Sequence, residues 1–425
     1  MSPLAAGTDV AIIGAGPAGL SAAIAAAEQG KRVLVIDQGL RPGGQIWRHR
    51  DQRTLGAVPR RLLKRAAALE VRMLSDARII DLDGPRDLLL HHGGRVVRHH
   101  ATALILATGA REQFLPFPGW TLPRVVGIGG LQALIKSGLT LRGAKVVIAG
   151  TGPLILPVAS AAASAGASLL LVAEQASRTA LLRFGMHVVR NKRDAMADAA
   201  RYRWSFRRTP FRTSSWVMRA DGDQFVERVT MQLNGDQRII ECDWLATGAG
   251  LVPNTELAQL IGCTLAGDAI AVDARQATSV SGVWAAGECT GVKGDAGAMA
   301  EGEIAGRAAA GDLTGANASS LQAARKAARA FAGHLSTTFA PRAELLALAD
   351  ADTVICRCEG IRRGDLDPTW SQRQAKLWTR VGMGECQGAV CGPACGALFG
   401  WSGNRVRPPL GAPQCREWKD GLSSA

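Results

Sequence analysis

The chain has 425 residues, of which 47% are hydrophobic, enough for two or three domains with apolar cores. Its 50 glycines and 5% aromatic residues are typical of nucleotide-binding α/β proteins. The formal charge of +14 is spread along the chain rather than gathered in blocks, so a nucleic-acid-binding protein is not expected. The densest basic stretch, Arg190 to Arg212, fits a surface that faces an acidic partner or solvent.

The first predicted unit is a strand, a glycine-rich turn, a helix and a second strand. Val10 to Ile13 and Val33 to Ile36 are short apolar runs suited to buried parallel strands. The helix, from about Ala18 to Gln29, directs its N-terminus at an anion in the turn. Asp37 follows the second strand, where a carboxylate accepts hydrogen bonds from ribose. The turn has G-x-G-x-x-G spacing, which allows close approach of a pyrophosphate; its glycines are Gly14, Gly16 and Gly19.

Three further segments resemble those of the two-dinucleotide-binding-domain flavoproteins, the class of thioredoxin reductase and glutathione reductase. The first is RPGGQIW, and the second is LILATGARE, with a strand expected from Leu104 to Thr108. The third is GVWAAGECTGVKGDAGAMAEGEIAG, with a strand expected from Gly282 to Ala286 and a helix from near Ala296. The resemblance implies that FAD occupies the first site.

The same resemblance implies a set of FAD contacts. The ADP half would be held by Gly14, Gly16, Ala18, Gly19 and Asp37. The flavin would be lined by Gly44, Gln45, Thr108 and Gly109, and the backbone of Ile79 would meet adenine. The ribityl chain would contact Gly287 and Glu288, where Glu replaces the usual Asp. A helix N-terminus at Ala296 and Gly297 would face the flavin O2, where its dipole stabilises the anionic reduced flavin.

A second strand–turn–helix–strand unit follows in AKVVIAGTGPLILPVASAAASAGASLLLVAEQ. Its turn has Gly150 and Gly152 but Ile155 at the third glycine position, where a side chain would push the helix off the strand or shift the turn. Pro157 is tolerated in a first helical turn, and Glu174 stands where a ribose-binding acid would be. We expect an empty or altered site; a working NAD(H) site, or one for another nucleotide such as ATP, stays open.

The cysteine positions exclude a disulfide reductase of the usual kind. No cysteine precedes Cys242, and no C-x-x-C pair occurs in the sequence. The segment CDWLATGAGLVPNTEL is expected only to close the second domain near Gly248.

Two uncharged runs, Val10 to Ala27 and Val146 to Ala173, have the length of a membrane span. Glycine and proline interrupt both early, and neither has the flanks of a signal peptide. We therefore expect no transmembrane segment and a cytoplasmic protein, at most peripherally associated with the inner membrane.

Five of the nine cysteines fall between Cys356 and Cys395, a clustering that favours metal over disulfides in a reducing compartment. Four thiolates in two glycine-rich loops fit an iron–sulfur centre or a structural zinc; they are Cys356, Cys358, Cys386 and Cys391. The C-x-C start is less usual for zinc and suits a [2Fe–2S] cluster. Cys395 could compete as a ligand but is interpreted as a buried thiol. Ordinary cysteines are expected at Cys242, Cys263, Cys289 and Cys415.

Four segments together resemble one family: VICRCEG, RVGMGECQG, RPGGQIW and the altered GTGPLILP. It is that of the FAD-binding α-type subunits of opine oxidase, hydrogen cyanide synthase and D-hydroxyproline dehydrogenase, related to the N-terminal part of the heterotetrameric sarcosine oxidase α subunit. The C-terminal module resembles a bacterioferritin-associated-ferredoxin-type [2Fe–2S] domain. The resemblance covers nearly the whole chain, and Ala389 departs from it where members usually have Arg.

The resemblance implies an electron-transfer subunit without catalytic residues of its own. A separate β subunit similar to D-amino-acid oxidase would oxidise an amino or imino acid, with hydroxyproline or another cyclic imino acid preferred to an opine. Electrons would reach this FAD and the cluster, and then a respiratory acceptor; further candidates are an FMN at a subunit interface and a small ferredoxin-like subunit. Two alternatives remain: a stand-alone NADH-dependent flavoprotein reductase, and a non-enzymatic assembly protein with structural zinc.

These elements predict an α/β two-dinucleotide-binding-domain flavoprotein with a small C-terminal iron–sulfur domain. The FAD-binding domain is expected at residues 1–115 and 280–322, and an NAD(P)-binding-like domain with the altered turn at 116–279. An Ala-rich linker at 323–350 would lead to the [2Fe–2S] domain and tail at 351–425.

Overall fold

The computed structural model describes residues 7–191, 193–311, 318–401 and 406–410. These residues form two compact units, each with its own main sheet, mixed in the first unit and parallel in the second. The first unit takes the described residues of 1–111, 252–332 and 405–425, and the second unit takes those of 112–251 and 333–404.

The first unit is built on a sheet whose strands follow the order β3-β2-β1-β6-β5-β4, with β19 also paired to β6. The carboxyl half of β6 pairs in parallel with β1 and β19, and its amino half pairs antiparallel with β5. The strands are β1 (Thr8–Ile13), β2 (Val33–Ile36), β3 (Arg72–Leu74), β4 (Ala77–Leu82), β5 (Asp87–His92), β6 (Arg95–Leu106) and β19 (Val283–Ala285). The expected first strands are thus confirmed, and Gly93 and Gly94 lie between the antiparallel strands β5 and β6.

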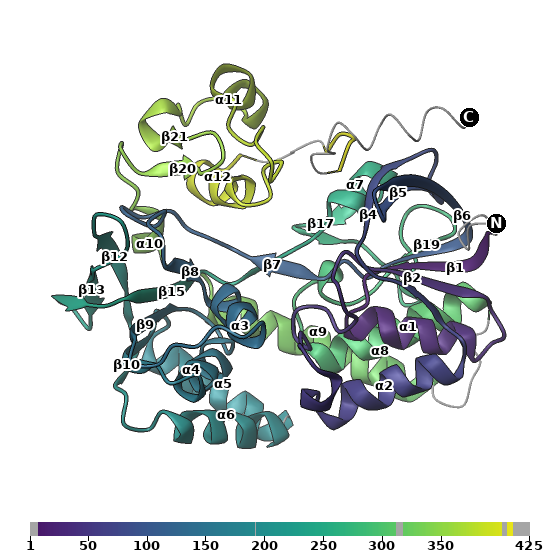
Figure 1. Cartoon of the computed structure of the whole chain (residues 1–425), viewed down its shortest axis with the longest axis horizontal. Coiled ribbons are helices and arrows are strands. Elements are labelled where there is room, and N and C mark those ends of the chain that lie inside the picture. Colours follow the sequence, from purple (N-terminus) through teal and green to yellow (C-terminus); the bar gives the residue numbers. More distant parts are fainter. Residues whose placement is uncertain (1–6, 192, 312–317, 402–405, 411–425) are drawn as a thin grey trace. The chain divides into compact units, whose positions relative to one another are not determined.

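Helices α1 and α8 lie side by side in this unit (Figure 1). Glycines permit the contact, because a Cβ on Gly302 would collide with the Ala18 carbonyl oxygen, and one on Gly306 with that of Ala22. The close packing places the first turn of α1 beside the middle of α8, at Gly302. The helices of the unit are α1 (Pro17–Ala27), α2 (Ala57–Ala68), α7 (Glu256–Ile261), α8 (Asp295–Ala310) and most of α9 (Ala318–Thr338). Short 3-10 turns lie at Gln52–Thr54 and Glu288–Thr290, and a small hairpin joins β17 (Leu265–Ala266) to β18 (Ala269–Ile270).

The second unit has a five-stranded parallel sheet in the order β11-β10-β9-β15-β8. Helix α4 packs on this sheet, and α6 packs on α4 (Figure 1). The sheet contains β8 (Val125–Gly127), β9 (Lys145–Gly150), β10 (Ser168–Glu174), β11 (Phe211–Arg212) and β15 (Trp244–Gly248). The helices are α3 (Ile128–Lys136), α4 (Ile155–Ser164), α5 (Arg178–Asn191) and α6 (Arg193–Ser205). A separate antiparallel sheet holds β12 (Ser215–Asp221), β13 (Arg228–Leu233) and β14 (Asp236–Glu241). The connecting strands are β7 (Ala110–Glu112) and β16 (Leu251–Pro253).

The cysteine-rich module belongs to the second unit and has a small core of its own around Ile355, Ala375 and Trp401. The indole N–H of Trp120 donates to the carbonyl oxygen of Val354 at 2.6 Å and ties the module to the rest of this unit. Its elements are β20 (Val354–Cys356), β21 (Ile361–Arg362), a 3-10 turn at Arg363–Asp365, α11 (Gln372–Thr379) and α12 (Cys391–Phe399), preceded by α10 (Ala343–Leu346).

The compact units differ from the predicted domain boundaries in two places. Residues 252–279 belong to the first unit, because α7, β17 and β18 pack on the core around Leu88 and Leu104. The predicted C-terminal domain is also divided between the two units. Leu410 belongs to the first unit, where its backbone N–H donates to the Ile80 carbonyl oxygen. The expected Ala-rich linker is mostly helical, as α9 and α10.

Candidate functional site

The glycine-rich turn after β1 has the tight geometry that its spacing predicts. Gly14 has φ +108°, and a Cβ there would collide with the Ala107 carbonyl oxygen. A Cβ on Gly19 would strike the carbonyl oxygen of Gly14, so the third glycine allows α1 to start against the strand. Gly16 precedes α1 without a capping side chain, which leaves backbone N–H groups to face an anion.

Asp37 and the segment around Gly44 lie against the same turn. The Asp37 carboxylate accepts from the N–H groups of Ala15, at 2.5 Å, and Gly39, at 2.6 Å. A Cβ on Gly44 would stand 3.0 Å from the Gly16 Cα, so only a bare backbone fits this approach. Gln45 follows in the same segment, and its Oε1 accepts from Arg48 at 3.0 Å.

Thr108 and Gly109 are braced by Asn254, a residue that sequence reasoning treated as structural only. The Asn254 side-chain amide donates to the Thr108 carbonyl oxygen at 2.8 Å, while the Thr108 hydroxyl donates to the Asn254 carbonyl oxygen at 2.6 Å. Arg111 donates to Asn254 Oδ1 at 2.7 Å and pairs with Glu256 at 2.7 Å. The spacing of these residues in the sequence carried no signal, because 146 positions separate Thr108 from Asn254.

The Gly287–Glu288 pair lies in the 3-10 turn that precedes α8. Gly287 has φ +83°, and a Cβ there would press on the Ala18 side chain. Burial raises the pKa of the Glu288 carboxyl, although the backbone N–H of Gly294 partly lowers it. Ala296 and Gly297 form the first turn of α8, as the sequence predicts, so this helix starts beside the turn that holds Glu288.

A buried ion pair supports that turn, and sequence reasoning missed it. Lys293 is 1% exposed and Glu301 is 0% exposed, with Nζ and Oε2 2.8 Å apart. The Lys293 ammonium also donates to the Thr290 hydroxyl at 2.7 Å and to the Gly287 carbonyl oxygen at 3.1 Å. The same Glu301 oxygen accepts from the Gly287 N–H at 3.1 Å. Burial lowers the pKa of Lys293, an effect that the Glu301 charge opposes.

Ile79 is the residue whose backbone is predicted to meet adenine. It lies inside β4, paired with Leu90 of β5, and its side chain is in the apolar core. Ala77, at the start of β4, lies closer to Asp37, because its backbone N–H donates to the backbone carbonyl oxygen of Asp37 at 3.0 Å.

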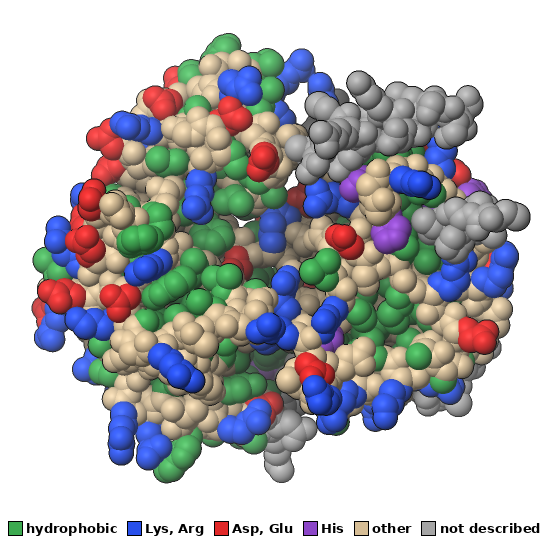
Figure 2. Space-filling view, viewed as in Figure 1, with side chains coloured by type: hydrophobic (Ala, Val, Ile, Leu, Met, Phe, Trp, Pro, Cys, Tyr) green, Lys and Arg blue, Asp and Glu red, His purple; other side chains and the backbone are tan. Residues whose placement is uncertain are grey.

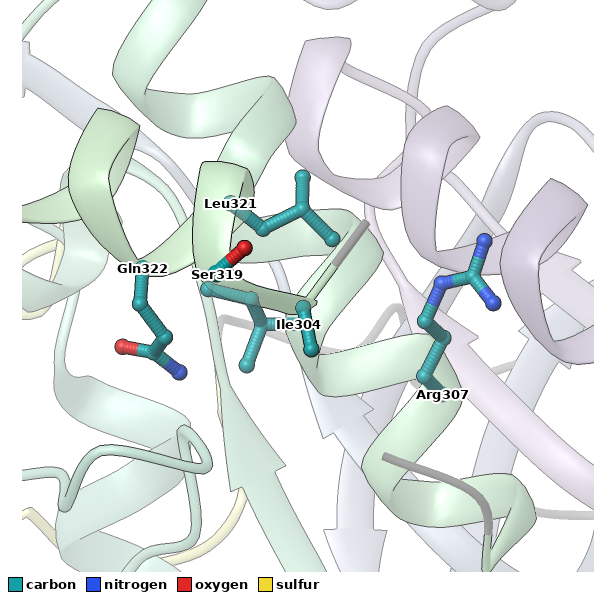
Figure 3. A pocket seen from close by; sticks show the side chains of 6 residues that line it. Ile304, Arg307, Ser319, Leu321 and Gln322 are labelled. Atoms are coloured by element: carbon teal, nitrogen blue, oxygen red, sulfur yellow. The ribbon is translucent and has the colours of Figure 1, made fainter. Parts of the chain in front are cut away.

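A pocket between α8 and α9 lies elsewhere in the first unit (Figure 3). Ile304 and Leu321 line it, and Arg307 is bonded to Glu303 at 2.9 Å. The lining is mostly apolar and is separate from the glycine-rich turn.

The second glycine-rich turn is longer than the first, as the side chain of Ile155 predicts. Helix α1 begins three residues after Gly14, whereas α4 begins five residues after Gly150, at Ile155 itself. Ile155 is fully buried in the core of the sheet. The third glycine position has therefore become the first residue of the helix.

The chain's own groups already use the polar atoms of this second turn. Glu174 accepts from the Thr151 hydroxyl at 2.9 Å and from the N–H groups of Gly152 and Ala176 at 2.8 and 2.9 Å. Burial raises the pKa of this carboxyl. The side chain of Gln175 donates to the Ala340 carbonyl oxygen at 2.9 Å.

A shallow pocket at the carboxyl ends of β9 and β15 is lined by side chains from the segment after α9. Leu345 and Leu348 line it together with Gly150, Gln175 and Gly248. A segment of the same chain thus borders the crevice in which a nucleotide binds in such folds.

The four predicted cysteine ligands come together in the C-terminal module. Cys356 ends β20 and Cys391 begins α12, and their thiols lie close enough for each to change the pKa of the other; the thiol of Cys386 is in the same relation to Cys391 and Cys358. The interaction with Cys391 lowers the pKa of Cys356 to about 6 and that of Cys386 to about 4. Among the described residues, no group of three or more His, Cys, Asp or Glu side chains is arranged to hold a metal ion.

The remaining cysteines of the described chain are buried thiols. Burial raises the pKa of Cys395 and of Cys242 to about 12. Cys263 and Cys289 lie in the apolar core of the first unit. Cys415 lies outside the described residues.

Comparison with known proteins finds one matching family over residues 8–330, described as pyridine nucleotide-disulphide oxidoreductase. Hydrogen cyanide synthase subunit HcnB of Pseudomonas aeruginosa is 31% identical over 94% of this chain and 93% of its own. An opine oxidase subunit from Rhizobium meliloti is 31% identical over 90% of this chain and 80% of its own. The first relative is named as a subunit of a synthase and the second as a subunit of an oxidase.

Among solved structures, L-proline dehydrogenase from P. horikoshii superposes with a TM-score of 0.67 at 18% identity, over 96% of this chain and 78% of that one. This likeness concerns the fold, which is that of FAD-dependent oxidoreductases. No helix in the described part of the chain is long and apolar enough to cross a membrane.

Proposed function

Because the chain belongs to the pyridine nucleotide-disulphide oxidoreductase family, we propose that it is the FAD- and [2Fe–2S]-carrying electron-transfer subunit of a heteromeric amino- or imino-acid dehydrogenase. The chain is an oxidoreductase by its family and by its relatives. The proposal is supported by likeness to named subunits of opine oxidase and hydrogen cyanide synthase over most of the chain. The observation that carries it is the contact among four cysteine thiols in the C-terminal module.

The residues of the first unit fit FAD. The bare backbone at Gly14, Gly16 and Gly44 leaves room for a pyrophosphate, and Asp37 lies at the end of β2 for the ribose. The first turn of α8 would stabilise negative charge on the reduced flavin. FAD accepts electrons in pairs, whereas an iron–sulfur cluster passes them singly.

The thiol contacts fit a two-iron cluster. In a [2Fe–2S] cluster each iron takes two cysteine thiolates, so the ligands fall into two pairs. Cys356 contacts Cys391 and Cys358 contacts Cys386, and a further contact of Cys386 with Cys391 joins the four thiols into one connected group.

Substrate oxidation would take place on a partner subunit related to D-amino-acid oxidase, with its own flavin. Hydroxyproline or another cyclic imino acid is the preferred substrate over an opine, and a respiratory carrier is the preferred acceptor. An FMN at the interface between subunits and a small ferredoxin-like subunit remain part of this proposal.

Reduction by NADH is not part of the proposed function. The second turn begins its helix late, Glu174 is already bonded to the turn, and Leu345 and Leu348 line the crevice. These features oppose the alternative of a stand-alone NADH-dependent reductase. Anaerobic mixing with NADH should therefore leave the flavin oxidised, and rapid bleaching would favour that alternative.

The test is the visible and EPR spectrum of anaerobically purified protein before and after dithionite, together with iron, sulfide and zinc analysis. We expect bound FAD, two irons and two sulfides per chain, and an EPR signal in the reduced sample. The variant Cys386→Ser should lose the EPR signal and keep FAD, whereas Cys395→Ser should keep both. Stoichiometric zinc without sulfide would refute the cluster and support a structural zinc module.

A further inference from the structure

The segment that contains α5 and α6 and continues to Arg212 carries an unusual concentration of positive charge. The sequence from Arg178 to Arg212 holds ten Lys or Arg and two Asp, a formal charge of +8 out of +14 for the whole chain. One of the two acids, Asp198, is paired with Arg201 at 2.9 Å. Figure 2 shows Lys and Arg side chains with hydrophobic ones among them along the lower left margin, where Figure 1 shows α6.

The same helices expose large apolar side chains. On α5, Leu182, Met186 and Val189 are 59%, 57% and 46% exposed, and their spacing of four and three residues places them on one face. The face at Phe184 and Val188 packs inward instead: Val188 is buried, and the Phe184 ring lies 5.1 Å from that of Phe339. Helix α5 therefore has a second, exposed apolar stripe that does not take part in packing the helix against the rest of its unit.

Trp204 on α6 adds an aromatic anchor. Its side chain is 68% exposed, and the Arg207 guanidinium lies 4.6 Å from the centre of its ring. On α5, the exposed Arg183 and Arg190 flank the apolar stripe, and neither has an ion-pair partner among the described side chains. Exposed leucine, methionine and tryptophan beside arginine are the combination found in helices that lie in a membrane interface.

We propose that the outward face of α5 and α6 is a docking surface for an anionic lipid bilayer. Protein interfaces usually carry charges of both signs, whereas an anionic bilayer offers a wide surface of one sign. A segment of +8 with exposed apolar side chains complements the bilayer in both charge and polarity. Since no described helix can span a membrane, the association is peripheral. This inference goes beyond the proposed function and does not depend on the cluster.

The experiment measures co-sedimentation of the full-length, FAD-bound protein with phosphatidylcholine vesicles that contain about one-third phosphatidylglycerol. We expect binding to these vesicles, weaker binding at high salt, and little binding to pure phosphatidylcholine. Arg183→Glu with Arg190→Glu should weaken partitioning by about thirtyfold or more. Leu182→Ser with Met186→Ser should weaken it as well, because the buried apolar area is lost.

Matched controls separate this surface from general charge and general exposure. Arg61→Glu with Lys64→Glu makes the same charge change on α2, and Ile239→Ser removes an apolar side chain that is 68% exposed on β14. Both controls should bind nearly as wild type. The proposal would be overturned if the α2 variant lost as much vesicle binding as the α5 variant. It would also be overturned if the wild type bound neutral and anionic vesicles equally. The proposal would also be overturned if the protein did not bind vesicles and the α5 variants no longer bound the partner subunit. The surface would then bind a protein rather than a bilayer.

Discussion

Replacing Lys293 by Met tests whether the buried ion pair holds the turn that carries Gly287 and Glu288. Methionine fills a similar volume without a charge, so packing changes little while three hydrogen bonds disappear. Glu301 would remain fully buried, with its nearest cation, Arg329, at 3.5 Å. The Gly287 N–H and the Thr290 hydroxyl would still hold the carboxylate, but its charge would be poorly compensated.

Breaking a buried pair by removing one partner typically costs about 3–5 kcal/mol. Water cannot replace the ammonium here, since both side chains are within 1% of full burial. We therefore expect the free energy of unfolding of the first unit to fall by about 4 kcal/mol. Because the loosened turn carries predicted ribityl contacts, FAD should also dissociate more readily. Urea unfolding of the FAD-free protein and flavin fluorescence during dilution measure the two effects separately.

A double variant and an exposed pair serve as controls. Lys293→Met with Glu301→Leu removes both charges and should recover most of the lost stability, although not the bond to Gly287. Arg98→Met breaks an ion pair whose side chains are 73% and 76% exposed and should change stability by less than about 1 kcal/mol. If Lys293→Met unfolds like Arg98→Met, the pair does not support the turn and the reasoning is wrong.

Three other substitutions test the packing, the cysteine module and the second turn. Gly302→Ala should destabilise the first unit by about 1–3 kcal/mol, because its Cβ meets the Ala18 carbonyl oxygen, whereas Gly333→Ala, with open space around it, should be neutral or stabilising in urea unfolding. Gly384→Ala should lower the iron content without lowering the FAD content, since its Cβ would overlap Cys358; unchanged iron would contradict the proposed ligand arrangement. Burial raises the pKa of Glu174 above the ordinary 4.5, so its contribution to stability is complete below pH 4.5 and is lost as the pH rises through the raised pKa. Glu174→Gln should remove this part of the pH dependence of the free energy of unfolding. If that free energy varies with pH in the same way in both proteins, the pKa of Glu174 is not raised.

The sequence alone determined the parts of this protein that depend on neighbouring residues. The first glycine-rich turn was predicted from the spacing of Gly14, Gly16 and Gly19. Gly14 is required by the distant Ala107 carbonyl oxygen, whereas Gly19 meets a local steric requirement, because its Cβ would strike the Gly14 carbonyl oxygen. The late start of α4 follows from Ile155 for the same reason. The clustering of cysteines near the end of the chain was also evident in the sequence, where thiols separated by glycines predict one local centre.

Only the tertiary structure decided which distant residues support these sites. Asn254 braces Thr108 although 146 positions separate them, and 252–279 joins the first unit through contacts that no local pattern encodes. The Lys293–Glu301 pair gave no signal either, because a lysine and a glutamate eight residues apart are ordinarily solvated, and only the packing of the folded first unit buries them. Periodicity and spacing report on the chain within one or two turns, whereas burial and long-range hydrogen bonds exist only once the chain has folded.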